Sequence, residues 1–132
     1  MIGLDTTIII RYLVQDDPAQ SQAASAAIST LTEGEQGFIS LVTLVEIHWV
    51  LNRAYGMNAE DAADVIARLA DTRELRIDQL DVVSAALNAR ENGVDFADAV
   101  IAHIGRAAGC THTLTFDRRA ARMDDMHLLE AD

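Results

Sequence analysis

The stretch Ile2-Gly-Leu-Asp-Thr-Thr-Ile-Ile-Ile-Arg-Tyr-Leu13 passes from a short apolar run through an acid into a helical segment. Its first three residues are typical of a buried strand. Thr6 can cap a helix that runs to Tyr12 or Val14, although several β-branched residues lower its helix propensity. The stretch therefore predicts a strand that leads directly into a helix, with Asp5 at the junction.

The rest of the chain repeats this alternation of short strands and helices. Further strands are predicted at residues 37–39, 75–77 and 113–115, with an edge strand at 127–129. Helices are predicted at residues 18–32, 41–54, 58–70, 81–92 and 96–108, followed by a short helix at 118–122. No repeat or linker divides the chain, so residues 1–132 are predicted to form a single domain. Strands separated by helices imply right-handed crossovers, and therefore an α/β fold with a mostly parallel sheet covered on both faces.

The composition is that of a globular protein with an unusual charge. Half of the 132 residues are apolar, and 21 acids against 10 bases, all of them Arg, give a net charge of −11. Such a balance argues against a protein that grips nucleic acid through a broad basic face, because that binding depends on neutralising phosphates. It is compatible with a cation-binding acidic site, a basic protein partner or simple solubility.

Features at the N-terminus and the single cysteine bear on the compartment. The first five residues include an acid, Asp5, where a signal peptide would need basic residues, and the sequence has no apolar run as long as a membrane span. Cys110 is the only cysteine, so no internal disulfide can form, and a lone cysteine is most often a small buried hydrophobe. We expect a soluble cytoplasmic protein that does not contact a membrane.

Four acids stand out by their positions. Asp5 and Asp117 follow predicted strands, where sites in α/β sheets form beyond the carboxyl ends. Glu46 and Asp98 lie in mostly apolar helical segments, where an ionised carboxylate is costly unless it is paired or bound to a cation. Together the four predict a site in which carboxylates converge.

Each acid also has a purely structural explanation. Asp5 and Asp117 could cap the helices that follow them, Glu46 could pair with Arg53, and Asp98 could interact with its helix dipole. Seven other aspartates, Asp95 among them, lie in polar or capping contexts that need no further explanation. For any one acid, the structural explanation is as good as a functional one. For all four acids together, one shared functional site explains more than four separate structural roles.

Convergence of the four acids would call for a metal ion. Carboxylates a few ångströms apart repel by about 4 kcal/mol per close pair at a surface-like dielectric, and a divalent cation removes that cost. An all-oxygen, carboxylate-rich site suits Mg²⁺ or Mn²⁺. The four histidines show no metal-ligand spacing, and His48, within an apolar helix, is predicted to be a core residue.

These residues resemble a known family. Residues 2–13 resemble the opening of PIN domains, especially the VapC-type toxins of bacterial toxin–antitoxin pairs. Val45-Glu46 with Trp49-Val-Leu51 resembles their second motif, Phe96-Ala-Asp98-Ala-Val-Ile-Ala102 the third, and Leu114-Thr-Phe-Asp117-Arg the fourth. The motifs occur in the family's order and spacing along the whole chain. Each motif is weak alone, but the four together are specific.

The resemblance implies a three-layer α/β/α fold around a central sheet of four to five short strands, with the four acids meeting at one end. It also implies cleavage of RNA that depends on Mg²⁺ or Mn²⁺. Asp5 and Asp98 are then the strongest candidate ligands, and Glu46 and Asp117 would complete the site through waters or a second ion. Whether one or two ions bind stays open.

The resemblance further implies partners. A VapC-type ribonuclease is a toxin held silent by a cognate antitoxin, and it forms homodimers, here through helices of the first half, and larger assemblies with the antitoxin. Because the site is acidic, we expect the antitoxin to present Arg or Lys to it. Near the acids, Arg11, Arg118 and Arg119 are candidate contacts for RNA phosphates, although a solvated helix would explain the last two equally well.

One position departs from the family pattern. PIN domains usually have Asn two residues after the first Asp, and this chain has Thr7. A hydroxyl is shorter than an amide and offers one donor, so Thr7 leaves the strength of the site open. Thr7 and Thr115 are the residues expected to support the acids. The alternative function is a PIN-like RNA- or protein-binding module with weak or lost nuclease activity. A phosphoryl-accepting or flavodoxin-like domain is disfavoured, because the chain has no Lys, P-loop or G-x-G-x-x-G motif.

Overall fold

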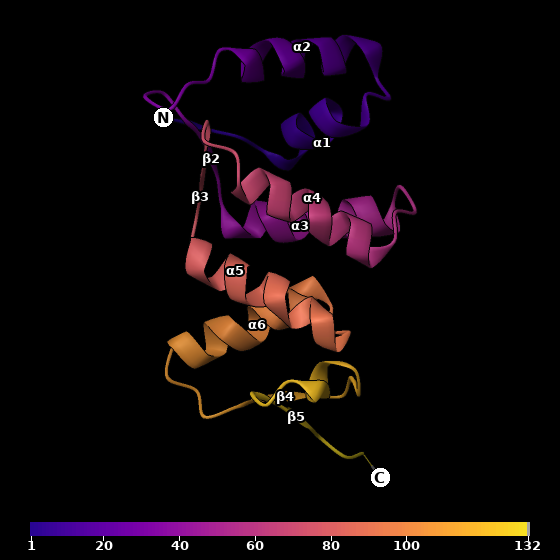
Figure 1. Ribbon diagram of the computed structural model, residues 1–132. Coiled ribbons are helices and arrows are strands. Elements are labelled where there is room, and N and C mark those ends of the chain that lie inside the picture. The colour runs from indigo at the N-terminus through magenta and orange to yellow at the C-terminus, as the bar shows by residue number, and fades with distance from the viewer. Residues whose placement is uncertain (132) are drawn as a thin grey trace. The chain divides into compact units, whose positions relative to one another are not determined.

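Every strand pairing in the computed structural model, which describes residues 1–131, is parallel. The chain forms two compact units, Met1–Gln79 and Leu80–Asp132, shown from indigo to yellow along the sequence in Figure 1. Each unit combines helices with its own parallel strands. The α/β class predicted from the alternation of elements is therefore confirmed.

The first unit holds a three-stranded sheet and four helices. Its elements are β1 (Ile2–Gly3), α1 (Thr6–Val14), α2 (Pro18–Ser29), β2 (Gly37–Ile39), α3 (Leu41–Arg53), α4 (Ala59–Ala70) and β3 (Leu75–Ile77). The strand order is β1-β2-β3, with Ile2 opposite Gly37 and Gly37 opposite Leu75. Helices α1 and α2 lie side by side, as do α3 and α4 (Figure 1).

Apolar stripes on these helices form the core of the first unit. Its largest fully buried side chains are Ile9, Ile39, Leu44, Ile47, Leu51 and Ile66. Gly37 fits this core because it has no side chain: a Cβ there would lie 2.7 Å from Leu4 Cδ1 and 2.9 Å from Leu31 Cδ1. The central strand β2 is thus held tightly between its neighbours.

The second unit holds two helices and a two-stranded sheet. Its elements are α5 (Leu80–Ala89), the 3₁₀ turn η1 (Arg90–Asn92), α6 (Phe96–Ala107), β4 (Thr113–Thr115), the 3₁₀ turn η2 (Ala120–Arg122) and β5 (Met126–Leu128). Strand β4 pairs with β5, and Thr113 lies opposite Met126. Ala102, Ala120 and Met126 are buried together in one apolar cluster.

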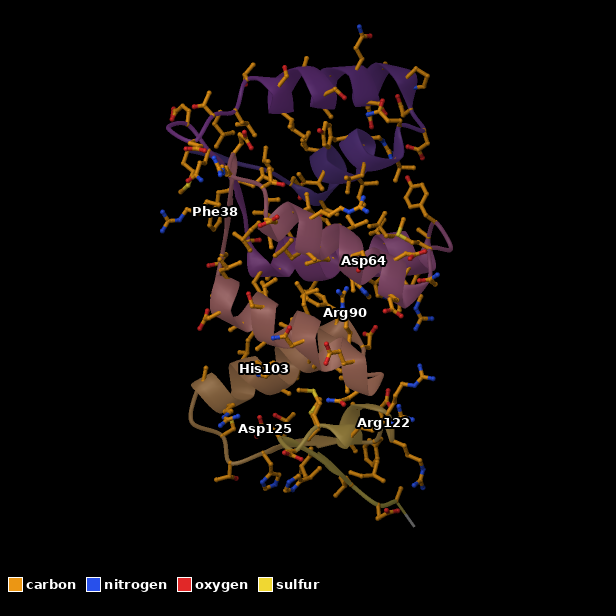
Figure 2. All side chains as sticks on the ribbon, viewed as in Figure 1. Phe38, Asp64, Arg90, His103, Arg122 and Asp125 are labelled. Atoms are coloured by element: carbon orange, nitrogen blue, oxygen red, sulfur yellow. The ribbon has the colours of Figure 1, made fainter. Side chains whose placement is uncertain are left out.

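Two polar contacts fasten the C-terminal segment of the second unit. Asp125, labelled in Figure 2, forms an ion pair of 3.5 Å with Arg106 of α6. Arg122, also labelled there, donates a hydrogen bond of 3.3 Å from Nη1 to the carbonyl of Asn92. Gly93, which follows η1, has the positive φ of 74° predicted for a residue that ends a helix.

Several boundaries differ from the predicted ones. Helix α2 ends at Ser29, three residues early, because the hydroxyls of Ser29 and Thr30 bond to carbonyls of Ala26 and Ala27 in the preceding turn. The predicted helix at 118–122 is reduced to one 3₁₀ turn, and β5 begins one residue before the predicted strand. Cys110, predicted to be buried, is exposed.

The strands fall into two sheets, whereas one sheet of four to five strands was expected. Strand β1 pairs only with β2, and β4 only with β5, within residues 1–131. Among these residues no helix is both long enough and apolar enough to cross a membrane.

Candidate functional site

Asp5 lies between β1 and α1 and acts as the N-cap of that helix. Its Oδ1 accepts a hydrogen bond of 2.8 Å from the Thr6 amide, and its extended backbone is typical of an N-cap. The cap is thus Asp5 and not Thr6, which is buried as the first helical residue. Within residues 1–131, Asp5 Oδ2 accepts no hydrogen bond, and the side chain is exposed. Capping therefore fixes the carboxylate while leaving one oxygen for a ligand.

Glu46 lies in the middle of α3 with an exposed side chain. The prediction that it is surrounded by apolar residues was wrong. Helix α3 buries the stripe that includes Leu44, Ile47 and Leu51, and Glu46 lies on the opposite face. Its carboxylate is therefore solvated and accessible, and the cost of burial gives no argument for a function.

Asp98 lies in the first turn of α6 and is half-buried. Burial raises the pKa of the Asp98 carboxyl above its ordinary value, and the neighbouring carboxylates of Asp95 and Asp117 raise it further. The second unit therefore brings two of the predicted site residues, Asp98 and Asp117, close enough to repel each other. An ionised Asp98 in this position would be stabilised by a cation.

Asp117 follows β4 and caps the short η2 turn. Its Oδ1 accepts hydrogen bonds from the amides of Arg119, at 2.7 Å, and Ala120, at 3.2 Å. The hydroxyl of Thr115, predicted to support this acid, accepts a hydrogen bond of 3.0 Å from the Asp117 amide. As at Asp5, one carboxylate oxygen is used in capping and Oδ2 accepts no hydrogen bond from residues 1–131.

Asp95 lies in a polar sequence context and was not predicted to belong to the site. It occupies the N-cap position of α6, but its side chain makes no capping hydrogen bond there. It instead lies near enough to Asp98 to raise that residue's pKa. The signal was present in the sequence, since Asp95 and Asp98 are three residues apart and lie on one side of the first helical turn.

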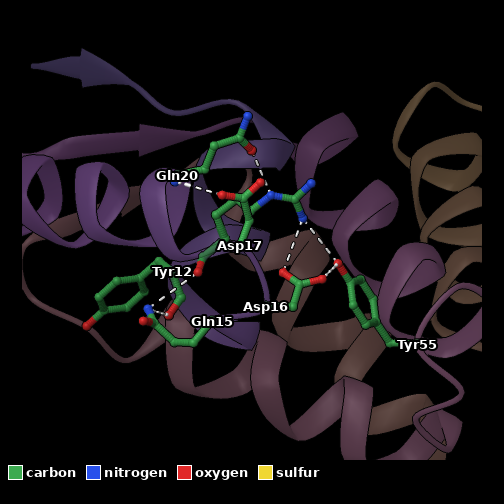
Figure 3. A network of polar contacts seen from close by, with 7 residues as sticks. Tyr12, Gln15, Asp16, Asp17, Gln20 and Tyr55 are labelled. Atoms are coloured by element: carbon green, nitrogen blue, oxygen red, sulfur yellow. Dashed lines mark hydrogen bonds and ion pairs between the residues drawn. The ribbon is translucent and has the colours of Figure 1, made fainter.

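Arg11, a candidate RNA contact, is engaged within the first unit (Figure 3). Its Nε donates to Gln20 Oε1 at 2.8 Å, and its Nη1 donates to the Tyr55 hydroxyl at 3.2 Å and to Asp16 Oδ1 at 3.4 Å. The Tyr55 hydroxyl in turn donates to Asp16 Oδ2 at 2.8 Å. These contacts tie α1 to the start of α2 and the end of α3.

Of the other residues of interest, three are exposed and one is buried. Thr7 is an exposed residue of α1 that lines a groove with Arg11 and Gln20. Arg118 and Arg119 are exposed as well. His48 is buried, and its Nε2 lies 3.2 Å from the Ala59 carbonyl oxygen, so its predicted role in the core is confirmed.

The chemistry of the four acids can be compared with the needs of a metal ion. No group of three or more His, Cys, Asp or Glu side chains within residues 1–131 has an arrangement that could hold one. The available donors are carboxylate oxygens, which are the ligands of Mg²⁺ and Mn²⁺. Asp5 and Asp117 each offer an oxygen not used in capping, and Asp98 is crowded by like charges. The donor types thus fit a hard divalent cation.

Comparison with known proteins gives one match. The sequence model of the PIN domain matches residues 2–126, a range that contains all four acids and extends over both units. No curated protein matches the chain. PIN domains are typically metal-dependent nucleases that use Mg²⁺ or Mn²⁺. Since the match covers nearly all of the sequence, this chain belongs to the PIN-domain family.

Proposed function

We propose that this protein is a ribonuclease that depends on Mg²⁺ or Mn²⁺ and hydrolyses RNA phosphodiester bonds. The observation that carries the proposal is that a PIN-domain match over residues 2–126 includes all four motif acids, Asp5, Glu46, Asp98 and Asp117. The raised pKa of Asp98 supports it: burial raises this pKa most, the carboxylates of Asp95 and Asp117 raise it further, and a nearby cation would favour the ionised form.

In this proposal Asp5 and Asp98 bind the metal ion, with Glu46 and Asp117 acting through water or a second ion. When bound, the ion supplies an activated water and neutralises charge on the phosphate. The chain's contribution is to hold the acids in fixed positions. The caps at Asp5 and Asp117, and the Thr115 hydroxyl behind Asp117, reduce the reorganisation that ligand binding requires.

The cleavage of a labelled single-stranded RNA, with Mn²⁺, with Mg²⁺ and with a chelator, tests this proposal. Wild type should cleave only with metal, and Asp5→Asn and Asp98→Asn should each lose more than the 10–100-fold that typically follows loss of a residue supporting a metal ligand. Asp124→Asn, which removes an exposed acid of the second unit, is the matched control and should cleave like wild type. Metal-independent cleavage, or full activity in both acid variants, would contradict the proposal.

We further propose that the nuclease is the toxin of a toxin–antitoxin pair. Its acid surplus, a net charge of −11, favours an inhibitor that presents Arg or Lys to the acids, and we expect a homodimer within a larger complex. Expression of the chain in a bacterial host should arrest growth, whereas expression of Asp98→Asn should not. Normal growth of a host that expresses a demonstrably active nuclease would contradict the proposed toxin role but not the proposed ribonuclease activity.

A second candidate function is a binding module that has lost turnover. Thr7 favours it, because this residue is exposed and makes no side-chain hydrogen bond within residues 1–131. A protein that binds RNA with Mn²⁺ present but leaves it intact would support this alternative against the first.

A further inference from the structure

Helix α3 has an exposed face that the proposed chemistry uses only in part. The face carries Val42, Glu46, Trp49 and Arg53, which are spaced by four, three and four residues and so follow one line along the helix. Trp49 is 59% exposed and Val42 is 77% exposed. The proposed metal ligand Glu46 is therefore followed, one turn later, by an exposed indole and, another turn later, by a guanidinium.

Single exposed apolar side chains are common, so exposure alone gives Trp49 no role. Its neighbours do. With a rise of about 1.5 Å per residue, Trp49 lies about 4.5 Å along the helix from Glu46, and Arg53 lies about 6 Å further. Within residues 1–131, Arg53 makes no hydrogen bond or ion pair, in contrast to Arg11. An acid, an aromatic ring and a free guanidinium thus stand in a row on one accessible surface.

This row matches the chemistry of single-stranded RNA. A chain with a charge of −11 cannot gain much affinity by neutralising many phosphates, so other contacts have to supply it. Aromatic side chains supply such contacts by stacking on bases, and arginines pair with individual phosphates. A protein partner suits the row less well, because covering it would bury the Glu46 carboxylate, and acidic residues are depleted at protein interfaces even though Trp and Arg are enriched there.

We propose that Trp49 positions the RNA substrate by stacking on a nucleobase beside the phosphodiester that is cleaved, while Arg53 contacts a flanking phosphate. The inference rests on the proposed ribonuclease function and adds to it the residue that holds the base. Trp49 then contributes to substrate affinity and to the choice of cleavage position, and Glu46 to the reaction itself.

Trp49 is the only tryptophan of the chain, so its fluorescence reports on this contact directly. A single-stranded RNA oligonucleotide is titrated into the cleavage-deficient Asp98→Asn protein, with Mn²⁺ present and absent. We expect saturable quenching. Within the same background, Trp49→Ala should weaken RNA binding by about 10-fold, as measured by anisotropy of a labelled oligonucleotide, and Trp49→Phe should recover most of the loss. Val42→Ala, which trims an exposed apolar residue of the same face, is the matched control and should bind within 2-fold.

The active protein gives a second measurement. Trp49→Ala should raise KM more than it lowers kcat, and it should alter the pattern of cleavage positions on a defined RNA. Unchanged fluorescence at saturating RNA, or equal RNA affinity of Trp49→Ala and wild type, would overturn the inference. Trp49 fluorescence that changes with protein concentration but not with RNA would also overturn the inference. Such a result would show that a second copy of the chain covers this face. Cleavage by wild type, followed in parallel, keeps failure of this inference separate from failure of the proposed function.

Discussion

The two units of the chain each contribute two of the four acids but hold them differently. In the first unit Asp5 caps α1 and Glu46 lies exposed in the middle of α3. In the second unit Asp98 is half-buried, and this burial raises its pKa, which the carboxylates of Asp95 and Asp117 raise further. A solvated acid can be explained without a ligand, whereas crowded carboxylates are costly without a cation. The second unit thus gives the stronger physical argument for the proposed metal binding.

After the losses expected for Asp5→Asn and Asp98→Asn, the next largest effect should come from removing the acid of each unit that is proposed to act through water. Glu46→Gln and Asp117→Asn should each lower RNA cleavage by about 10–100-fold with Mn²⁺ present. Asn retains the capping oxygen at position 117, so the fold around η2 should be preserved. Cleavage rates are compared with those of Glu60→Gln, an exposed acid in the first turn of α4. Loss of activity in only one of the two variants would confine the chemistry to one unit.

Substitution of Thr7 in the first unit tests for a gain of nuclease activity. If the missing amide attenuates the site, Thr7→Asn should raise the cleavage rate by about 10–100-fold. Ala19→Asn, at an exposed position in the first turn of α2, serves as the control for adding the same amide elsewhere. An unchanged rate in an active enzyme would show that Thr7 supports the acids as well as Asn does.

The stability of the metal-free protein should distinguish Asp98, which other carboxylates crowd, from the solvated acids Asp5 and Glu46. The folded-state pKa of Asp98 is raised, so its ionisation destabilises the fold as pH rises through that value. Asp98→Asn should therefore raise the Tm of the chelator-treated protein at pH 7, and the difference should shrink as pH falls through the pKa. Added Mn²⁺ should raise the Tm of wild type but not of the variant. A lower Tm for Asp98→Asn without metal would contradict the crowding.

The smallest expected effect concerns Arg11 in the first unit. Arg11→Met keeps the aliphatic stem but removes the contacts with Asp16, Gln20 and Tyr55, and should lower the free energy of unfolding by about 1 kcal/mol. Urea denaturation measures this loss. Because the guanidinium is already engaged, RNA affinity should change less than in Arg118→Met. A large loss of RNA affinity with unchanged stability would instead assign Arg11 to RNA binding.

Much of the fold could be predicted because local signals agree with one another. Several helix boundaries predicted from single residues are confirmed or moved by a few residues. These residues are Pro18, the capping residues Ser40 and Asn58, and Gly93. The division of the strands into two sheets could not be predicted, because pairing depends on contacts between residues far apart in sequence.

The site was predictable to a lesser degree. The half-burial of Asp98 follows from its apolar neighbours, whereas the exposure of Glu46 depends on which face of α3 packs inward. The missing cap at Asp95 is a matter of side-chain orientation, which its residue type alone does not determine.

Titration of Mn²⁺ into chelator-treated protein, followed by calorimetry, tests the central claim most directly because it requires no RNA and no turnover. Wild type should bind Mn²⁺ in a saturable manner, and Asp5→Asn and Asp98→Asn should each weaken that binding by at least about 10-fold, with Asp124→Asn unchanged. Such a result would show that acids from both units serve the metal. Wild-type affinity in both acid variants, or no Mn²⁺ binding by wild type, would contradict the account.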